Sequence, residues 1–175
     1  LKKFIDLYKD VWSMIDSLKD IQPTITTHHD IPKEKSRQYQ LIASIIASMI
    51  ESDIDVFTTR WKNEIPKYYD KHSSMLLTIH VKALHAIKLW LSGNRVWKNF
   101  REFSILGMEL KKDKIPLNDI FSALTFSRKS IWVQVIEKNI LHSPLEIYIA
   151  LEINNRIISF YDKITYFLIK GYERY

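Results

Sequence analysis

The chain has 175 residues, of which 46% are hydrophobic, enough to fill the core of one domain of ordinary size. Only three glycines and five prolines occur, too few for the many tight turns of a β-sandwich or barrel. The formal net charge is +6, and residues 71–115, with nine basic and three acidic side chains, account for all of it. This composition predicts an all-α fold with one locally basic surface.

Three further features bear on the class of protein. The absence of cysteine excludes disulfide bonds, zinc–thiolate sites and thiol catalysis. No apolar run approaches the roughly 18 residues that a membrane span needs, and the first residues lack the apolar core of a signal peptide. The sequence begins with Leu1 rather than methionine. We therefore expect a cytoplasmic chain without membrane contact, cut from a longer protein.

The first predicted element is an amphipathic helix over residues 4–18. Its apolar residues recur at steps of three and four, with Lys and Asp between them: Phe4, Leu7, Tyr8, Val11, Trp12, Ile15 and Leu18. Residues 21–32, with two prolines and a cluster of Thr, His and Asp, predict a connecting loop. We therefore divide the chain into an N-terminal helix and linker over 1–34 and a helical domain over 35–175.

Five more helices are predicted in the domain, and the first four are as follows. One is expected over 35–65, with drifting apolar positions, and another over 75–91, ending at Gly93, the residue type favoured just after a helix. A further helix is expected over 96–110. Pro116 fits the first turn of the next one. The apolar residues that align along this last helix are Leu117, Ile120, Phe121, Leu124, Ile131, Trp132 and Val135.

The last predicted helix is the longest. Ser143, Pro144 and Glu146 have the spacing of a capping box with proline at the first helical position. The helix then carries apolar residues at alternating steps of three and four: Ala150, Ile153, Ile157, Phe160, Ile164, Phe167 and Gly171. This seam favours packing inside the chain's own bundle, and a homodimer contact through the same helix remains open. The whole pattern predicts a bundle of about six to seven helices with a long C-terminal helix.

Arg128 interrupts an otherwise apolar stripe, since Leu124, Ile131 and Val135 share its side of the helix. A buried guanidinium needs a negative partner, because an isolated charge in the interior costs several kcal/mol. Three interpretations stay open at this point. The arginine pairs internally with Glu152 or Asp162, or it escapes to water at an edge, or it meets an anionic ligand or a partner's carboxylate.

His80 is the one histidine of its helix that shares an apolar face. His85 lies with Thr78, Lys82 and Lys88 on a more polar side. A lone histidine on an apolar face is commonly a hydrogen-bonded core residue. The alternative is a proximal haem ligand, which would need an apolar cavity and a second-shell acceptor. We expect the core role and no cofactor, and His28–His29 is expected in a solvated loop without metal.

Catalytic motifs are missing from the sequence. It contains no G-x-S-x-G, H-E-x-x-H, Walker or G-x-G-x-x-G pattern. Acidic residues such as Glu51, Asp53 and Asp55 are expected on solvated helix faces. We therefore expect a non-enzyme. A nucleic-acid binder remains an alternative that we do not favour, because no recognition motif accompanies the basic residues that would serve it, which are Lys82, Lys88, Arg95, Lys98 and Arg101.

Three stretches resemble the RsbRD-type N-terminal sensor domains. Residues 45–65, "IIASMIESDIDVFTTRWKNEI", resemble their opening helix with its tryptophan, here Trp61. Residues 117–139, "LNDIFSALTFSRKSIWVQVIEKN", resemble their central helix, and the matching positions are Arg128, Ser130 and Trp132. Residues 145–173 resemble the closing helix, with Asn154 or Asn155 and Phe160 to Asp162 at the expected places. The resemblance covers about residues 41–175.

The resemblance implies a non-catalytic input module that is globin-like in helix number and packing, often without haem. Such modules precede histidine kinase, diguanylate cyclase or stress-regulator output domains. We therefore expect a sensor domain of a two-component or related signal-transduction protein that binds a small ligand or partner and passes the signal through its C-terminal helix. The candidate ligand-binding residues are Arg128, His80 and Trp132. The alternatives are a pure dimerisation or interaction module and a haem-binding globin-like sensor.

Overall fold

The chain folds into a helical bundle in a computed structural model that describes residues 31–64, 72–94 and 96–174. Within these ranges there are six α-helices and no strand, which confirms the predicted all-α class with a long C-terminal helix. The predicted helix over 4–18 lies outside the described residues. The helices are α2 (Ile31–Ser52), α3 (Ile54–Glu64), α4 (Ser73–Leu91), α5 (Trp97–Lys112), α6 (Leu117–Glu137) and α7 (Pro144–Glu173).

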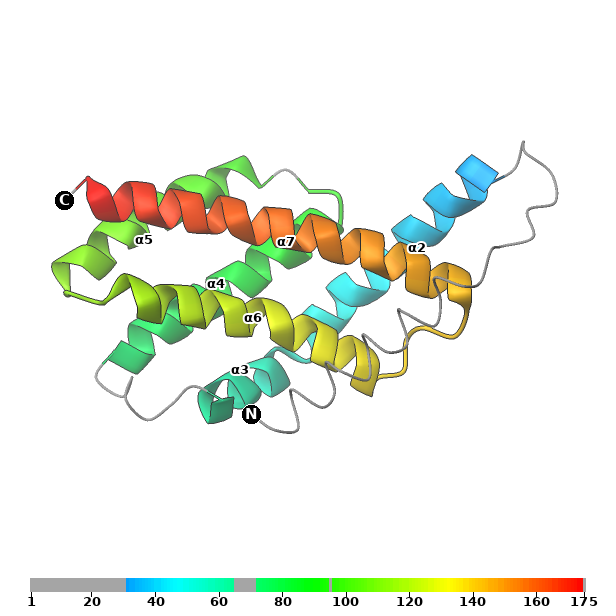
Figure 1. Cartoon of the computed structure of the whole chain (residues 1–175), viewed down its shortest axis with the longest axis horizontal. Helices are drawn as coiled ribbons and strands as arrows, with labels where there is room; N and C mark the ends of the chain where they lie inside the picture. The colour runs from blue at the N-terminus through cyan, green and yellow to red at the C-terminus, as the bar shows by residue number, and fades with distance from the viewer. Residues whose placement is uncertain (1–30, 65–71, 95, 175) are drawn as a thin grey trace.

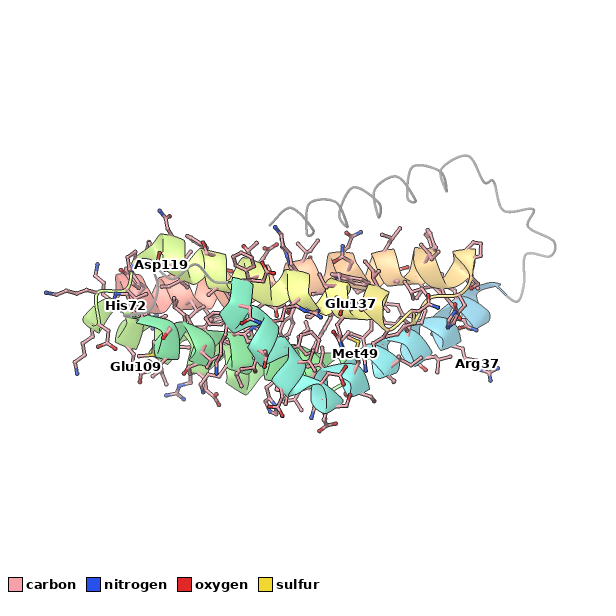
Figure 2. All side chains as sticks on the ribbon, turned by 90° about the horizontal axis from the view of Figure 1, so that it is seen from below. Arg37, Met49, His72, Glu109, Asp119 and Glu137 are labelled. Carbon is pink, nitrogen blue, oxygen red and sulfur yellow. The ribbon has the colours of Figure 1, made fainter. Side chains whose placement is uncertain are left out.

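Helices α6 and α7 lie side by side in opposite directions, with α4 behind them and α3 at the edge of α6 (Figure 1). Helix α5 runs in the same direction as α7 and forms the closest helix pair of the bundle with it. Seen from below, α6 and α7 occupy the upper side and α2 and α4 lie beneath them (Figure 2). One apolar core joins all six helices, with fully buried side chains such as Ile46, Leu76, Ile131 and Ile153. None of the described helices combines the length and apolarity needed to cross a bilayer.

The structure confirms the predicted end of α4 and the predicted start of α7. Gly93 has φ +79°, and its N–H donates to Trp90 while the N–H of Asn94 donates to Leu89, which is a Schellman motif. At the start of α7, the Ser143 hydroxyl accepts from the Glu146 N–H at 3.2 Å, and the Glu146 carboxylate accepts from the Ser143 N–H at 3.0 Å. This reciprocal pair is the capping box that the sequence predicted.

The helix expected over 35–65 is interrupted in the structure, so this prediction is wrong in detail. It begins at Ile31 and divides at Asp53 into α2 and α3. The Asp53 N–H still donates to the Met49 carbonyl, and the Asp53 carbonyl accepts from the Phe57 N–H. The backbone bonding therefore continues through the corner, and the change of direction brings Phe57 and Trp61 into the core.

The seam of α7 packs inside the bundle, as expected, along an unbroken helix of 30 residues. Near its end, α7 meets α5 at a point where each helix has a glycine, Gly171 and Gly107. A Cβ atom added to Gly107 would overlap the Leu168 carbonyl oxygen, and one added to Gly171 would overlap the Ser104 carbonyl oxygen. The two backbones therefore touch directly. The buried members of the predicted seam are Ala150, Ile153, Ile157, Phe160, Ile164 and Gly171, and Phe167 is half-buried.

Candidate functional site

Helix α6 carries three polar side chains into the interior. Ser127, Ser130 and Gln134 are each at most 4% exposed. The hydroxyls of Ser127 and Tyr161 lie 2.8 Å apart, and the Ser130 hydroxyl donates to the Ser127 carbonyl at 2.7 Å. Burial raises the pKa of the Tyr161 hydroxyl well above its usual value, so it stays neutral and serves as a hydrogen-bonding group. This pair is a specific polar link between α6 and α7.

Arg128 lies at the rim of the same two helices, half-buried. It directly follows Ser127, whose hydroxyl meets that of Tyr161, and its positive charge partly offsets the rise in the pKa of Tyr161. Neither expected internal partner binds it. Glu152 is engaged by Lys35 at 2.9 Å and by Arg156 at 3.3 Å, and Asp162 is exposed. Among the described residues Arg128 has no ion pair, which leaves the edge position and the anionic-ligand interpretation.

Trp132 lies one helical turn after Arg128, so the structure brings these two predicted site residues together on α6. The indole is half-buried against the edge of the core. Its Nε1 is buried without an acceptor among the described residues. Phe121, which aligns with Trp132 in the predicted apolar stripe of α6, is 39% exposed and is not among the buried residues of that stripe.

His80 does not join Arg128 and Trp132. Its side chain is 0% exposed and stacks on Trp61 at a centroid distance of 5.3 Å. The Trp61 Nε1 donates to the Ala123 carbonyl of α6 at 3.3 Å, which fixes the indole between α4 and α6. His80 is therefore a core residue, as expected. The expected hydrogen bond is missing, because neither ring nitrogen meets hydrogen-bond geometry with a described residue.

The surroundings of His80 keep the imidazole neutral. Burial lowers the pKa of His80 from 6.5 to about 4, and a backbone group of Phe57 opposes this only in part. A proximal haem ligand is oriented by an acceptor on its second ring nitrogen and presents the first to an open pocket. Here the backbone of Phe57 is the one acceptor near the ring among the described residues, it does not meet hydrogen-bond geometry, and Trp61 covers one face of the ring. The residues around His80 therefore do not fit a haem.

A polar cluster at the α2–α3 corner was missed in the sequence. Asp53, expected on a solvated face, has a side chain only 12% exposed and accepts from Gln134 at 2.6 Å and from Lys138 at 3.1 Å. Hydrogen bonds from Lys138, and then from Gln134, lower the pKa of the Asp53 carboxyl. The cluster ties the corner to the end of α6. The only signal in the sequence was the polar pair Ser52–Asp53 within an apolar helix.

The basic segment is partly neutralised by acidic neighbours. Lys82 lies 3.5 Å from Glu102, and Lys88 lies 2.7 Å from Glu51. Arg101 is exposed, Arg95 lies outside the described residues, and the Lys98 side chain is not described. These pairs break up the basic stripe that nucleic-acid binding would use.

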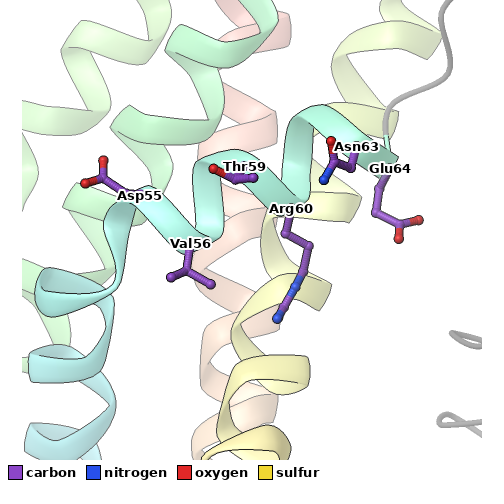
Figure 3. A pocket seen from close by; sticks show the side chains of 6 residues that line it. All are labelled: Asp55, Val56, Thr59, Arg60, Asn63 and Glu64. Atoms are coloured by element: carbon purple, nitrogen blue, oxygen red, sulfur yellow. The ribbon is translucent and has the colours of Figure 1, made fainter.

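The surface of α3 holds a shallow pocket (Figure 3). Arg60, one of its lining residues, forms an ion pair with Glu137 of α6. The pocket has mixed charge and is open to solvent, so it does not resemble an enclosed ligand site. No group of three metal-ligating side chains occurs within residues 31–64, 72–94 and 96–174. The pocket is lined by Asp55, Val56, Thr59, Arg60, Asn63 and Glu64.

Comparisons with models of protein families, with curated proteins and with solved structures found no match. The resemblance to RsbRD-type sensor domains therefore stays a prediction from the sequence.

Proposed function

We propose that this chain is a non-catalytic sensor or regulatory domain of a cytoplasmic signal-transduction protein. An anionic small molecule or partner group binds beside Arg128 and Trp132 and changes how α7 packs on the bundle. The changed position of α7 then reaches an output domain of the same protein, such as a histidine kinase, a diguanylate cyclase or a stress regulator. The proposal includes a homodimer formed through the exposed side of α7.

One observation supports this proposal above the others. Helix α7 is unbroken over 30 residues and is contacted by neighbouring helices from its first third to its last turn. A helix of that length extends roughly 45 Å at 1.5 Å per residue, so a small tilt at one end moves the other end by several ångströms. Arg128 sits beside this helix with no carboxylate partner among the described residues, on the side of the Ser127–Tyr161 link. An anion held there would alter a contact of α7.

The mechanism requires two packings of α7 with different affinities for the ligand, because a ligand that binds both equally shifts nothing. The chain has no cysteine, so pairs of introduced cysteines can be spin-labelled selectively. Ser36→Cys with Leu145→Cys would report the separation between the start of α2 and the start of α7, since both residues are exposed. Asp162→Cys with Glu173→Cys lies within α7 and serves as the matched control.

Nucleotides, sugar phosphates and dicarboxylates would be screened for a rise in the melting temperature, which reports binding to the folded state. We expect a stabilising compound to change the α2–α7 distance distribution while the distance within α7 stays constant. Arg128→Gln should remove both effects. A panel without any stabilising compound, or stabilisation without a distance change, would contradict the proposal. Sedimentation at several concentrations tests the homodimer separately.

A further inference from the structure

Helix α6 has a second, mostly apolar stripe at the margin of the core, on the side away from its fully buried residues. Phe121, Thr125, Lys129, Trp132 and Ile136 follow steps of four and three residues and therefore lie along one side of the helix. The fully buried residues Ala123 and Ile131 lie on the roughly opposite side. We call the five-residue stripe the outer face of α6.

The outer face is unusual for an external helix side, because four of its five residues are aromatic, aliphatic or threonine. Phe121 is 39% exposed and Ile136 is 37% exposed. The Nε1 of Trp132 also lacks an acceptor among the described residues. A largely apolar stripe that only Lys129 interrupts, with a buried donor that lacks an acceptor, is typical of a surface that is covered by another element.

No described helix covers this side of α6. Its neighbours are α4 behind it, α3 along one edge and α7 along the other (Figure 1). In the view from below, no described helix lies above α6, while α2 and α4 lie beneath the layer that it shares with α7 (Figure 2). The outer face is therefore available to residues beyond the described bundle.

The sequence itself contains an element of matching shape and chemistry. Residues 4–18 present seven apolar side chains on one helical side, including Trp12, and would be about 22 Å long at 1.5 Å per residue. The outer face runs along most of α6, whose 21 residues extend about 31 Å. Asp10 and Asp16 flank the apolar side of 4–18, and their charge complements Lys129. The apolar side of residues 4–18 is therefore complementary in chemistry to the outer face of α6 and short enough to lie along it.

The position of α2 allows the two to meet. Lys35, near the start of α2, contacts Glu152 at 2.9 Å and lies over the ring of Tyr148, so α2 begins beside the N-terminal third of α7. That part of α7 follows directly after α6 in the chain. Residues 19–30 can extend up to about 40 Å, which is more than the length of α6.

We infer that the outer face of α6 is the docking site of residues 4–18 of the same chain, which bind it as an amphipathic helix. A tethered segment has an effective local concentration of the order of millimolar, so at micromolar protein it outcompetes a second copy of the chain. The inference does not require the proposed sensing function, but both involve Trp132, so the docked segment would lie beside the proposed ligand site. Displacement of the segment would expose the outer face to a partner.

Hydrogen–deuterium exchange on the full chain tests the docking. We expect the amides of residues 7–18 to exchange at least tenfold more slowly than in a free peptide of the same sequence. The double substitution Phe121→Asp with Ile136→Asp should bring them to within twofold of the peptide rate. The matched control, Ile105→Asp with Tyr166→Asp, alters two apolar residues that are 45% and 57% exposed on α5 and α7, and should leave the protection unchanged.

Three outcomes would overturn the inference. The first is unprotected residues 7–18 in the unaltered chain. The second is protection that survives the substitutions at Phe121 and Ile136. The third is protection that rises with protein concentration, which would assign the contact to a second copy. Slow exchange in α7 verifies that each variant is folded. If a variant is not folded, Trp12→Asp, placed within the docking segment, takes its place and should abolish the protection.

Discussion

Acidification should destabilise the fold through His80. The imidazole is fully buried, lies against Trp61 and has no hydrogen-bond partner among the described residues for either nitrogen. Its pKa is lowered to about 4, whereas the unfolded chain keeps a value near 6.5. Between these two values the unfolded state binds a proton that the folded state does not. Stability is therefore complete above about pH 6.5 and falls as the pH is lowered toward 4.

The size of the effect follows from the separation of the two pKa values. One pKa unit corresponds to about 1.4 kcal/mol, so lowering the pH from 7 to 5 should reduce the free energy of unfolding by about 2 kcal/mol through His80. The carboxyls with lowered pKa, such as Asp53 and Glu152, act in the same direction at lower pH. Their stabilisation is present above the unfolded values near 4 and is lost as the pH falls through the folded ones. The interval from pH 7 to 5 therefore isolates the histidine.

Urea unfolding at pH 7 and pH 5 measures this difference directly. The control is His80→Phe, which keeps an aromatic ring against Trp61 and cannot take up a proton. We expect the unaltered chain to lose about 2 kcal/mol between the two pH values and the variant to lose far less. Equal losses in the two proteins would refute the reasoning. Titration of the His80 ring by nuclear magnetic resonance with a midpoint near 6.5 in the folded protein would also refute it.

Two predictions concern the helix packing and the helix ends. Gly171→Ala should lower the free energy of unfolding by about 2–3 kcal/mol because its methyl group would overlap the Ser104 carbonyl, as measured by urea unfolding. Alanine normally stabilises a helix relative to glycine, so a stabilised Gly171→Ala would disprove the close contact. The exposed control Asn155→Ala should change the free energy of unfolding by less than about 0.5 kcal/mol. Lys114 has φ +57°, so Lys114→Gly should raise the melting temperature by relieving about 1 kcal/mol of backbone strain. Lys112→Gly, inside α5, should lower the melting temperature instead, and a fall in both variants would contradict this interpretation.

The elements that the sequence predicted well are those with local causes. The capping box at Ser143 and the turn at Gly93 each depend on residues within five positions of one another. The seam of α7 is periodic over many turns, so its burial could be read from spacing alone. The turns at Lys114 and Asn139 were not singled out, although both adopt positive φ like Gly93. Lysine gives no indication of this conformation, and asparagine adopts it more often than other non-glycine residues but less often than glycine.

The features that the sequence did not predict depend on contacts between distant residues. Asp53 and Gln134 are separated by 81 positions, and no local pattern indicates that their side chains meet. Spacing also failed on α6, because apolar residues occur on more than one side of it. In the sequence Phe121 and Trp132 align with the other apolar residues of the helix, whereas in the structure Phe121 is 39% exposed and Trp132 packs at the margin of the core. The apolar residues on the outer face of α6 are those to which we infer that residues 4–18 bind.

The two ends of α7 are held in different ways, which indicates where a change in packing would begin. Its last turns touch α5 backbone to backbone at Gly107 and Gly171, and such a contact has no room to shift without overlap. Its first third is held to α2 by the partly exposed pair of Lys35 and Glu152, and exposed ion pairs contribute little to stability. The contact between α2 and α7 is therefore the weaker one. Since residues 1–30 precede α2 in the chain, we expect binding or release of that segment to act first on the contact between α2 and α7.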